Sequence, residues 1–189
     1  MKTAVTLLAV AAALALAVPA SAELAYWNGH CYEARYRPDG ITWGDAQAEC
    51  EADGGHLAVI NSEAENDFCF DLAFDVPDMW FLDGFNNGIG PWLGGAQAEG
   101  AEEPGGGWGW VNGDPWTWTH WAYGEPNNGS GSSGGEDRLH FMCYQCLIAE
   151  TWNDLLSDDL PLGYIFEFDG DCAVPAMRST WGTIKTLYR

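Results

Sequence analysis

The chain has 189 residues, of which 28 are acidic and 7 are lysine or arginine, and its formal net charge is −21 at neutral pH. A balance this acidic excludes proteins that bind nucleic acids or anionic membrane surfaces mainly through charge. Beyond its first 22 residues the chain has the length of one domain with its own core.

Residues 1–22, "MKTAVTLLAVAAALALAVPASA", combine a basic start, an apolar run and a small-residue ending. This order is typical of a secretory signal peptide that is cleaved after Ala22. The run is rich in alanine and contains Pro19, which argues against a membrane anchor. No later segment is long and apolar enough to cross a bilayer. We therefore expect a secreted or extracellular protein without a membrane span.

The next segments alternate between strand and helix patterns. Residues 26–36 alternate aromatic and polar side chains, which is typical of a strand or a hairpin. Residues 41–55 predict a helix that Thr42 caps and a Gly-Gly pair ends. Residues 56–60, "HLAVI", predict a short buried strand, and residues 61–74 predict a second helix with an acidic first turn.

Glycine and tryptophan dominate residues 76–121, and nine of the 11 tryptophans lie between Trp80 and Trp181. Short aromatic stretches separated by Gly, Pro, Asn and Asp predict brief strands and turns. We expect most of these rings to build the core in place of aliphatic side chains. After a polar loop, residues 138–150 and 162–170 are the best strand candidates of the chain.

The six cysteines of an exported chain favour disulfides, but their connectivity cannot be deduced from spacing. Cys143 and Cys146 have C-x-x-C spacing. A zinc site would call for a second such pair, and a redox site would call for a helix start. The pair lies instead in a strand-like segment, which favours neither function.

Two polar segments carry candidate metal ligands: "GEPNNGSGSSGGED" at residues 124–137 and "TWND" at residues 151–154. Calcium takes about six to eight oxygen ligands, which carboxylates and amide carbonyls supply. Five side chains and one backbone carbonyl would leave two positions for outside oxygens. Acidic and amide residues are also common in solvated loops, so spacing alone leaves a plain polar loop open. The five candidate side chains are Glu125, Asn127, Glu136, Asn153 and Asp154.

From Trp27 to Asp169 the order of motifs resembles a C-type lectin-like domain of the EPN/WND type, in a bacterial-like secreted form. The resemblance is carried by residues 29–66 and then by "WLGG", "WGWVNGDPWTWTHWAYGEPNN", "GED", "TWND" and "YIFEF". It implies an α+β, C-type lectin-like fold with two helices flanking small antiparallel sheets and a long irregular loop region. The expected boundaries are a signal peptide at 1–22, the domain at 23–170 and a C-terminal tail at 171–189, whose role stays open.

By this resemblance, the five candidate side chains match the principal calcium ligands of the family, so calcium is the expected cofactor. Pro126 matches a proline that follows a cis bond, which would turn Glu125 and Asn127 toward one ion. The order Glu-Pro-Asn resembles members that bind mannose, fucose or N-acetylglucosamine. Two neighbouring sugar hydroxyls would fill the spare calcium positions and would hydrogen-bond the same side chains. The expected carbohydrate-binding residues are Glu125, Asn127, Glu136 and Asn153.

A second calcium ion of the family would draw on Asn128, which replaces the usual aspartate, and on Asp137. The stretch from Phe70 to Pro91 resembles an insertion into the family pattern.

The departures from the pattern concern cysteines. Three positions where the family usually has cysteine hold other residues here: Arg138, Ser157 and Phe166. Cys50 therefore lacks its usual partner, and Cys172 is one candidate to replace it. Cys143 and Cys146 are additional, and either is a candidate partner for Cys31 or Cys69.

The favoured function is a secreted, calcium-dependent carbohydrate-binding protein whose partners are mannose-type glycans. A shallow single site would bind weakly, so several sites acting together, as in a homo-oligomer, would help. The alternative is a lectin-like adhesion or recognition domain that binds a protein or a surface, with calcium serving only stability. An enzyme is not expected, because no histidine forms a triad and no acid stands opposite a nucleophile.

Overall fold

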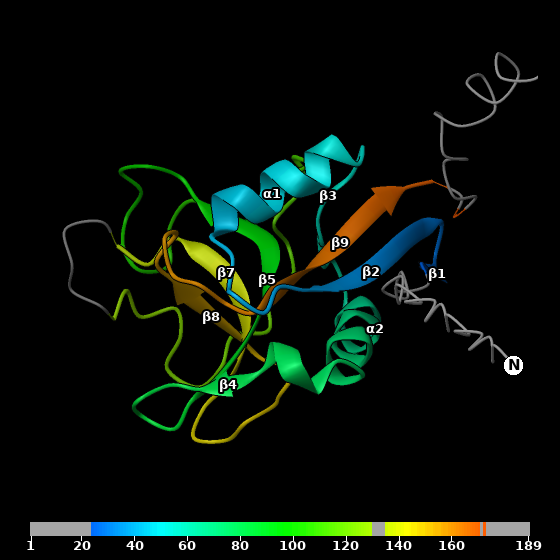
Figure 1. The fold of residues 1–189 in the computed structure, drawn as a ribbon. Coiled ribbons are helices and arrows are strands. Elements are labelled where there is room, and N and C mark those ends of the chain that lie inside the picture. Colours follow the sequence, from blue (N-terminus) through cyan, green and yellow to red (C-terminus); the bar gives the residue numbers. More distant parts are fainter. Residues whose placement is uncertain (1–23, 130–134, 171, 173–189) are drawn as a thin grey trace, which may run out of the picture.

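The computed structural model describes residues 24–129, 135–170 and 172. Two helices lie on opposite sides of the pair formed by β2 and β9 (Figure 1). The expected signal peptide at 1–22 lies outside the described residues, as does the expected tail except for Cys172. Within the described ranges, no helix has the length and apolar character needed to cross a membrane.

The N-terminal hairpin and the first helix form where the sequence predicts them. β1 (Ala25–Trp27) pairs antiparallel with β2 (His30–Tyr36) across a tight turn at Asn28 and Gly29. α1 (Trp43–Ala52) begins at its cap Thr42, whose hydroxyl accepts the N–H of Asp45 at 3.2 Å. A capping hydroxyl satisfies one of the helix N–H groups that have no intrahelical partner.

The second helix also matches its prediction, whereas the strand before it is shorter than expected. α2 (Glu63–Phe74) begins after Ser62, whose hydroxyl accepts the N–H of Glu65. β3 (His56–Leu57) covers only the first two residues of "HLAVI". The remaining three residues are buried, but they bond to their neighbours without a regular ladder.

The sheet joins strands from both halves of the chain in the order β1-β2-β9-β5-β7-β8. β5 (Gly88–Gln97) lies at its centre and pairs antiparallel with β7 (Arg138–Cys143), which in turn pairs with β8 (Trp152–Leu155). The predicted α+β class is confirmed. The small antiparallel sheets are not separate, however, because a parallel bridge from Trp92 of β5 to Tyr164 of β9 (Gly163–Asp169) joins them.

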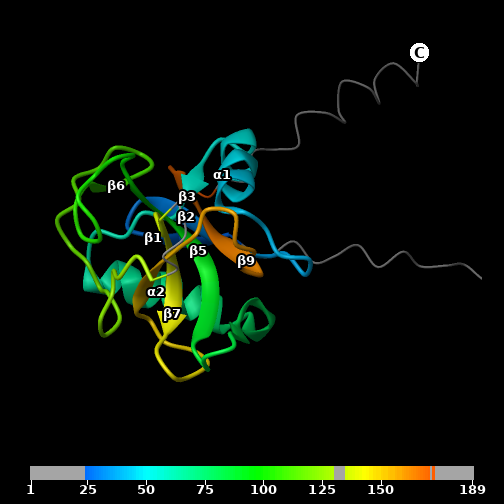
Figure 2. The same ribbon diagram turned by 90° about the vertical axis from the view of Figure 1, so that its left-hand side faces the viewer.

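The shorter elements attach at the edges of this arrangement. β3 pairs with β9, while β4 (Phe81–Leu82) and β6 (Trp108–Trp110) pair with β5. A 3-10 turn, η1 (Pro77–Met79), connects α2 to β4. In Figure 2 the irregular segment around β6 lies to one side of the sheet. The aromatic stretch at residues 116–121, "WTWTHW", has one isolated bridge, between Trp121 and Trp152, in place of a strand.

The core has two parts because alternate residues of a strand face opposite sides of the sheet. On β9, Ile165 packs in the cluster that contains α2, whereas Tyr164 and Phe166 pack with α1. In the first cluster the fully buried ring of Trp152 lies 5.1 Å from Trp118, measured between ring centroids. Three more indole rings lie within 6.1 Å of Trp152, so the expected aromatic core is confirmed.

The disulfides differ from those expected. Cys31 is joined to Cys172, and Cys143 is joined to Cys146, while Cys50 and Cys69 are free and buried. Cys172 as the partner of Cys50 is therefore wrong, and so is the pairing of the C-x-x-C cysteines with Cys31 or Cys69. The physical reason lies in the sheet: Cys31 is paired in register with Phe168 near the end of β9, so the chain leaving β9 reaches β2 and not α1.

Candidate functional site

The two polar segments meet because β7 and β8 pair as an antiparallel ladder. Asn153 and Asp154 lie on β8, opposite His140 and Leu139 of β7. Glu136 immediately precedes this ladder, and the N–H of the next residue, Asp137, donates to the carbonyl of Leu155 at 3.2 Å. The fold thus places Glu136 beside the strand that carries Asn153 and Asp154.

Asp154 fixes the loop that carries the other two candidates. The N–H of Asn127 donates to its Oδ1 at 3.1 Å, and the N–H of Asn128 donates to its Oδ2 at 2.8 Å. The Glu125–Pro126 bond is cis, as the resemblance implies. Asp154 is fully buried, so its carboxylate serves as the internal anchor of the loop.

Two further hydrogen bonds close the loop on itself. The N–H of Gly129 donates to Oε2 of Glu136 at 2.6 Å. The N–H of Glu136 donates to the side-chain oxygen of Asn128 at 2.9 Å. Both ends of the segment 130–134, which lies outside the described residues, are therefore held next to each other.

A cavity of about 320 Å³ opens at this place. Four of the five candidate ligands line it, namely Glu125, Asn127, Glu136 and Asn153, and Gly129 lies among them. Asp154 is not part of the lining and supports the loop from behind. The rest of the lining comes from the β4–β5 turn and from β5, β7 and β8: Asp83, Phe85, Asn87, Ile89, Met142 and Leu155.

The carboxyl groups of Glu125, Glu136 and Asp154 lie close together at this place. No residue that lines the cavity has a cationic side chain. Burial, together with the charges of Asp154 and Glu136, raises the pKa of Glu125 to about 7. Burial also raises the pKa of Glu136 and the pKa of Asp154. Oε2 of Glu125 is buried and has no hydrogen-bond partner. A set of hard carboxylate and amide oxygens with an unpaired buried member fits a calcium ion.

Asn153 is held by a residue that the sequence argument missed. Its amide nitrogen donates to the backbone carbonyl of Asp154 and lies 3.1 Å from Nε2 of His140. Burial lowers the pKa of His140 to about 4, so the ring is neutral and Nε2 accepts. With the nitrogen engaged, the carbonyl oxygen of Asn153 is the atom left for a cation. The i, i+13 spacing gave no signal, because only the β7–β8 register brings the two residues together.

The two residues expected at a second calcium ion do not present a shared set of free oxygens. Oδ2 of Asp137 pairs with the guanidinium of Arg138 at 3.0 Å. The side-chain oxygen of Asn128 accepts the N–H of Glu136. Oδ1 of Asp137, however, is buried without a hydrogen-bond partner, so the second ion stays a prediction.

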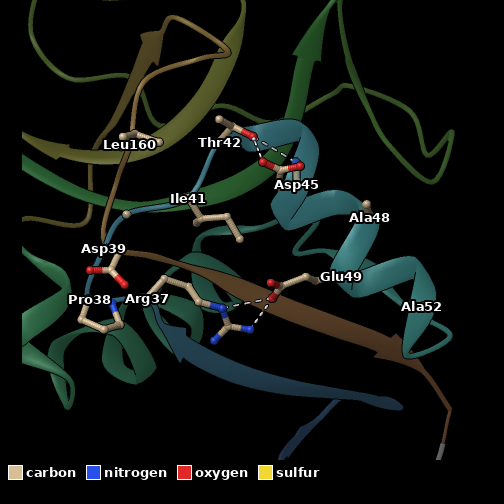
Figure 3. Close-up of a pocket in the computed structure, with 11 residues that line it drawn as sticks. Arg37, Pro38, Asp39, Ile41, Thr42, Asp45, Ala48, Glu49, Ala52 and Leu160 are labelled. Atoms are coloured by element: carbon tan, nitrogen blue, oxygen red, sulfur yellow. Dashed lines mark hydrogen bonds and ion pairs between the residues drawn. The ribbon is translucent and has the colours of Figure 1, made fainter.

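A second hollow, of about 610 Å³, lies between α1 and Leu160 (Figure 3). Four of its polar side chains already bond in two pairs. Nε of Arg37 donates to Oε2 of Glu49 at 3.1 Å, and the hydroxyl of Thr42 donates to Asp45 at 2.8 Å. It therefore offers no convergent set of free ligands comparable to that of the cavity at Glu125.

Comparison with known proteins places the fold. The family model described as "Lectin C-type domain" matches residues 39–154. A perlucin-like protein of Mytilus galloprovincialis is 29% identical over 140 residues, which are 74% of this chain and 76% of that protein. Asialoglycoprotein receptor 2 of Mus musculus is 30% identical over 134 residues, which are 68% of this chain but 35% of the receptor. The chain thus spans about three quarters of the first relative and about a third of the second.

Solved structures give the same fold with different binding properties. The carbohydrate-recognition domain of the mouse scavenger receptor C-type lectin has a TM-score of 0.55 and 25% identity, and the match covers 79% of this chain and 97% of that one. A calcium-independent type II antifreeze protein has a TM-score of 0.59 and 22% identity, with 83% and 98% covered. Since a neighbour with this fold is calcium-independent, the fold alone does not establish calcium binding by this chain.

Proposed function

The chain belongs to the C-type lectin domain family, and from this premise we propose that it is a calcium-dependent carbohydrate-binding protein of the mannose type. Carbohydrate binding is what membership of a lectin family implies, and this family is in general not enzymatic. Calcium dependence and the preferred sugar are the finer proposals. The observation that supports them most directly is the gathering of Glu125, Asn127, Glu136 and Asn153 around one cavity, with Asp154 behind their loop.

These five side chains would hold the ion, which when bound would offer two positions to neighbouring hydroxyls of a sugar. The side chains around the ion would also orient the sugar through hydrogen bonds. The carboxylates of Glu125 and Glu136 would accept hydrogen bonds from hydroxyls, and the amide nitrogen of Asn127 would donate one. Asn153 would contribute its carbonyl oxygen, because its nitrogen is engaged with His140 and with the carbonyl of Asp154. Alternating acceptors and donors select one arrangement of vicinal hydroxyls.

The preference for mannose, fucose or N-acetylglucosamine rests on the order Glu125-Pro126-Asn127. The reverse placement of acid and amide, Gln-Pro-Asp, would exchange an acceptor and a donor and would fit galactose. We also propose that residues 1–22 are removed on export, that residues 23–170 form the lectin domain and that the protein is secreted. The mass of the exported protein tests this, because cleavage after Ala22 leaves Glu23 as the first residue.

The test of binding is retention on immobilised mannose in calcium and release by a chelator. The double variant Glu125→Gln with Asn127→Asp should lose mannose and gain galactose on a glycan array. Glu99→Gln is the matched control, since Glu99 is exposed and does not line the cavity. This variant should bind as the unaltered protein does.

Retention that persists in chelator would overturn the proposal, and so would an unchanged glycan profile of the double variant. Calcium binding without any glycan binding would favour the alternative, in which the domain recognises a protein or a surface and calcium only stabilises it. Calorimetry of calcium binding beside the glycan array separates these outcomes.

A further inference from the structure

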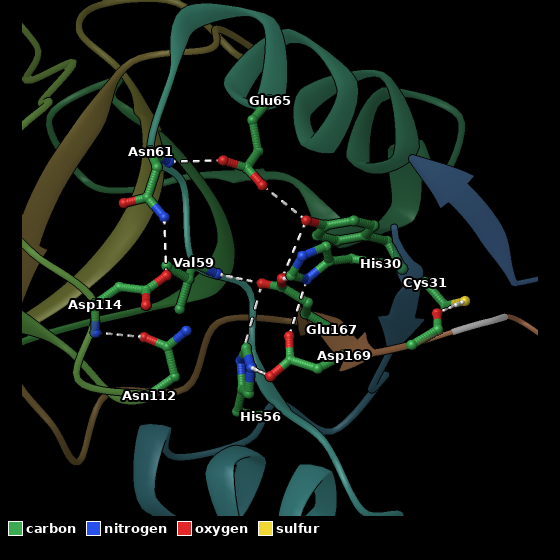
Figure 4. Close-up of polar contacts among 12 residues, drawn as sticks. His30, Cys31, His56, Val59, Asn61, Glu65, Asn112, Asp114, Glu167 and Asp169 are labelled. Atoms are coloured by element: carbon green, nitrogen blue, oxygen red, sulfur yellow. Dashed lines mark hydrogen bonds and ion pairs between the residues drawn. The ribbon is translucent and has the colours of Figure 1, made fainter. Parts of the chain in front are cut away.

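A second cluster of ligand-type side chains lies away from the cavity, on the far side of β5 from β7 and β8. His30 of β2 is paired in register with Asp169 of β9, and His56 of β3 is paired with Glu167 of β9. Figure 4 shows the four side chains pointing toward one another. Nδ1 of His30 lies 2.8 Å from Oε1 of Glu167 and 2.9 Å from Oδ1 of Asp169.

Two histidine nitrogens of this cluster are close to carboxylates but have no hydrogen bond. Nδ1 of His30 and Nε2 of His56 are both buried atoms without a hydrogen-bond partner. Nε2 of His56 lies 3.5 Å from Oδ2 of Asp169. These nitrogens lie close to carboxylate oxygens, but the direction of the contacts is poor for hydrogen bonds. The lone pairs of the nitrogens and the oxygens could instead contact a shared cation.

The tautomer of His56 strengthens this point. Nδ1 of His56 lies 2.9 Å from the backbone carbonyl of Leu57, which can only accept, so Nδ1 carries the proton. In the neutral ring, Nε2 then presents a lone pair to the carboxylate of Asp169. A cation placed between the lone pair of Nε2 and the carboxylate of Asp169 would contact both. A ring N–H bonded to a backbone carbonyl is also how metal-bound histidines are commonly oriented.

The carboxylate of Glu167 is held in place by its own neighbours. This residue is only 2% exposed. Its Oε2 accepts the N–H of Val59 at 2.8 Å, and its Oε1 lies 3.1 Å from the hydroxyl of Tyr32. Tyr32 in turn contacts Glu65 at 2.8 Å. Such outer hydrogen bonds fix a ligand carboxylate before the metal arrives.

We propose that His30, His56, Glu167 and Asp169 bind one divalent cation of the zinc class. The residues whose ligand atoms all lie within 4.8 Å of one another are His30, Glu167 and Asp169. His56 adjoins this group through Asp169, with its Nε2 3.5 Å from Oδ2. Bonds of about 2.0–2.2 Å in a tetrahedral zinc site place ligand atoms about 3.3–3.6 Å apart. The separation of 3.5 Å agrees with this value, whereas those of 2.8 and 2.9 Å are shorter, so the carboxylates of Glu167 and Asp169 would have to move away from His30 when the ion binds.

The ligand set distinguishes this site from a calcium site. Imidazole nitrogen suits zinc and its neighbours in the transition series, whereas calcium takes about six to eight oxygens. The ion would tie β2, β3 and β9 together at the place where the Cys31–Cys172 disulfide also crosses between β2 and the chain after β9. The site is independent of the sugar-binding proposal, because it shares no residue with the cavity at Glu125.

The experiment is calorimetric titration of Zn²⁺ into the full protein, prepared without a histidine tag and stripped with a chelator. We expect one strong site per chain and a rise in melting temperature. His30→Gln and His56→Gln should each weaken zinc binding by at least about 10–100-fold, because that range is already reached when only an outer-shell partner of a ligand is lost. Co²⁺ should give the visible absorption of a tetrahedral ligand field.

Two controls keep the result interpretable. His120→Gln changes a histidine that stacks on Trp118 away from the cluster, and it should leave zinc affinity unchanged. If the His30 and His56 variants fail to fold, Asp169→Asn replaces them, because Asp169 has 58% of its side chain exposed and its loss should not disturb the core. Zinc binding that is absent from the unaltered protein, or that is unchanged in Asp169→Asn, would overturn the proposal.

Discussion

Cys50 is fully buried on α1, in the same apolar cluster as Phe166 of β9. Phe166 occupies the strand position at which the resemblance leads one to expect a cysteine. Its ring lies under the guanidinium of Arg35, with 4.0 Å between the carbon of the guanidinium and the ring centroid. The contact between Phe166 and Arg35 thus takes the place of the disulfide that the family pattern would give to Cys50. Cys50 packs as a small apolar side chain.

Neither free cysteine should react in the folded protein. Burial raises the pKa of the Cys50 thiol to about 12 and raises the pKa of the Cys69 thiol as well. Only the thiolate is nucleophilic, so a chromogenic disulfide reagent should not react with the native protein. After unfolding without reductant, the reagent should react with two thiols per chain. Cys50→Ala should reduce the unfolded count to one. A fast-reacting thiol in the native protein would contradict this assignment.

β8 carries two ligand candidates and depends on α2 for its position. The indole N–H of Trp152 donates to the side-chain oxygen of Asn66 at 2.7 Å, and the amide of Asn66 donates to the carbonyl of Glu150 at 3.0 Å. Both side chains are buried, so these bonds have no competition from water. The pair therefore links the helix to the strand that carries Asn153 and Asp154.

Asn66→Leu should lower the free energy of unfolding by about 1–3 kcal/mol, because it leaves the buried indole N–H without an acceptor. In a Trp152→Phe background the same change should cost clearly less, since no indole N–H remains to be paired. Denaturant unfolding of the four proteins of this double-mutant cycle measures the difference. Equal costs in both backgrounds would show that the hydrogen bond contributes nothing.

The β4–β5 turn brings an aromatic side chain to the edge of the cavity. The carboxylate of Asp83 accepts the N–H of Phe85 at 2.7 Å and the N–H of Asn87 at 2.8 Å, which fixes the turn. Phe85 lines the cavity and is 82% exposed. A ring in this position can cover the apolar face of a sugar held at Glu125.

Phe85→Ala should weaken glycan binding by about 3–10-fold, the size of one aromatic contact of about 0.5–1.5 kcal/mol. The free energy of unfolding should change by no more than about 0.5 kcal/mol, because the side chain is exposed. Phe74→Ala is the matched control, since Phe74 is 55% exposed on α2 and does not line the cavity. Equal affinities of the two variants for mannose-type glycans, measured by calorimetry, would rule out this role.

Local chemistry predicted the elements, and distant contacts decided how they join. The cap at Thr42 and the start of the second helix, for which Asn61 and Ser62 were both candidate caps, depend on chemistry within a few residues, so the sequence predicted them. The bridge from Trp92 to Tyr164 and the Cys31–Cys172 bond depend on strand pairing between the two ends of the chain, which no local pattern reveals.

The same distinction between local patterns and distant contacts applies to the candidate site. Its five ligand candidates stand in two short motifs, and the structure brings those motifs together, although their role at a metal stays a prediction. The contact of His140 with Asn153 and the Asp83–Asn87 turn at the cavity were missed, because only the pairing of β5 with β7 and of β7 with β8 brings these residues to the site.

For the whole molecule, the excess of negative charge makes stability depend on pH and on cations. The pKa of Glu125 is raised to about 7, above its ordinary 4.5, chiefly by burial and then by Asp154 and Glu136. The folded protein therefore holds a proton at this carboxyl between about pH 4.5 and pH 7, which the unfolded chain has already lost. This contribution to stability is complete below the lower value and disappears as the pH rises through the higher one.

The stability of the metal-free protein should consequently fall as the pH rises from about 5 to 8, and calcium should restore it. A cation bound to the folded state stabilises that state, but protons compete for the same carboxylates at low pH. Melting temperatures in excess calcium and in chelator should differ most near pH 8 and converge near pH 5. In Glu125→Gln the metal-free protein should depend less on pH and the calcium effect should be small throughout. A difference between calcium and chelator that is as large at pH 5 as at pH 8 would mean that these carboxylates do not hold the ion.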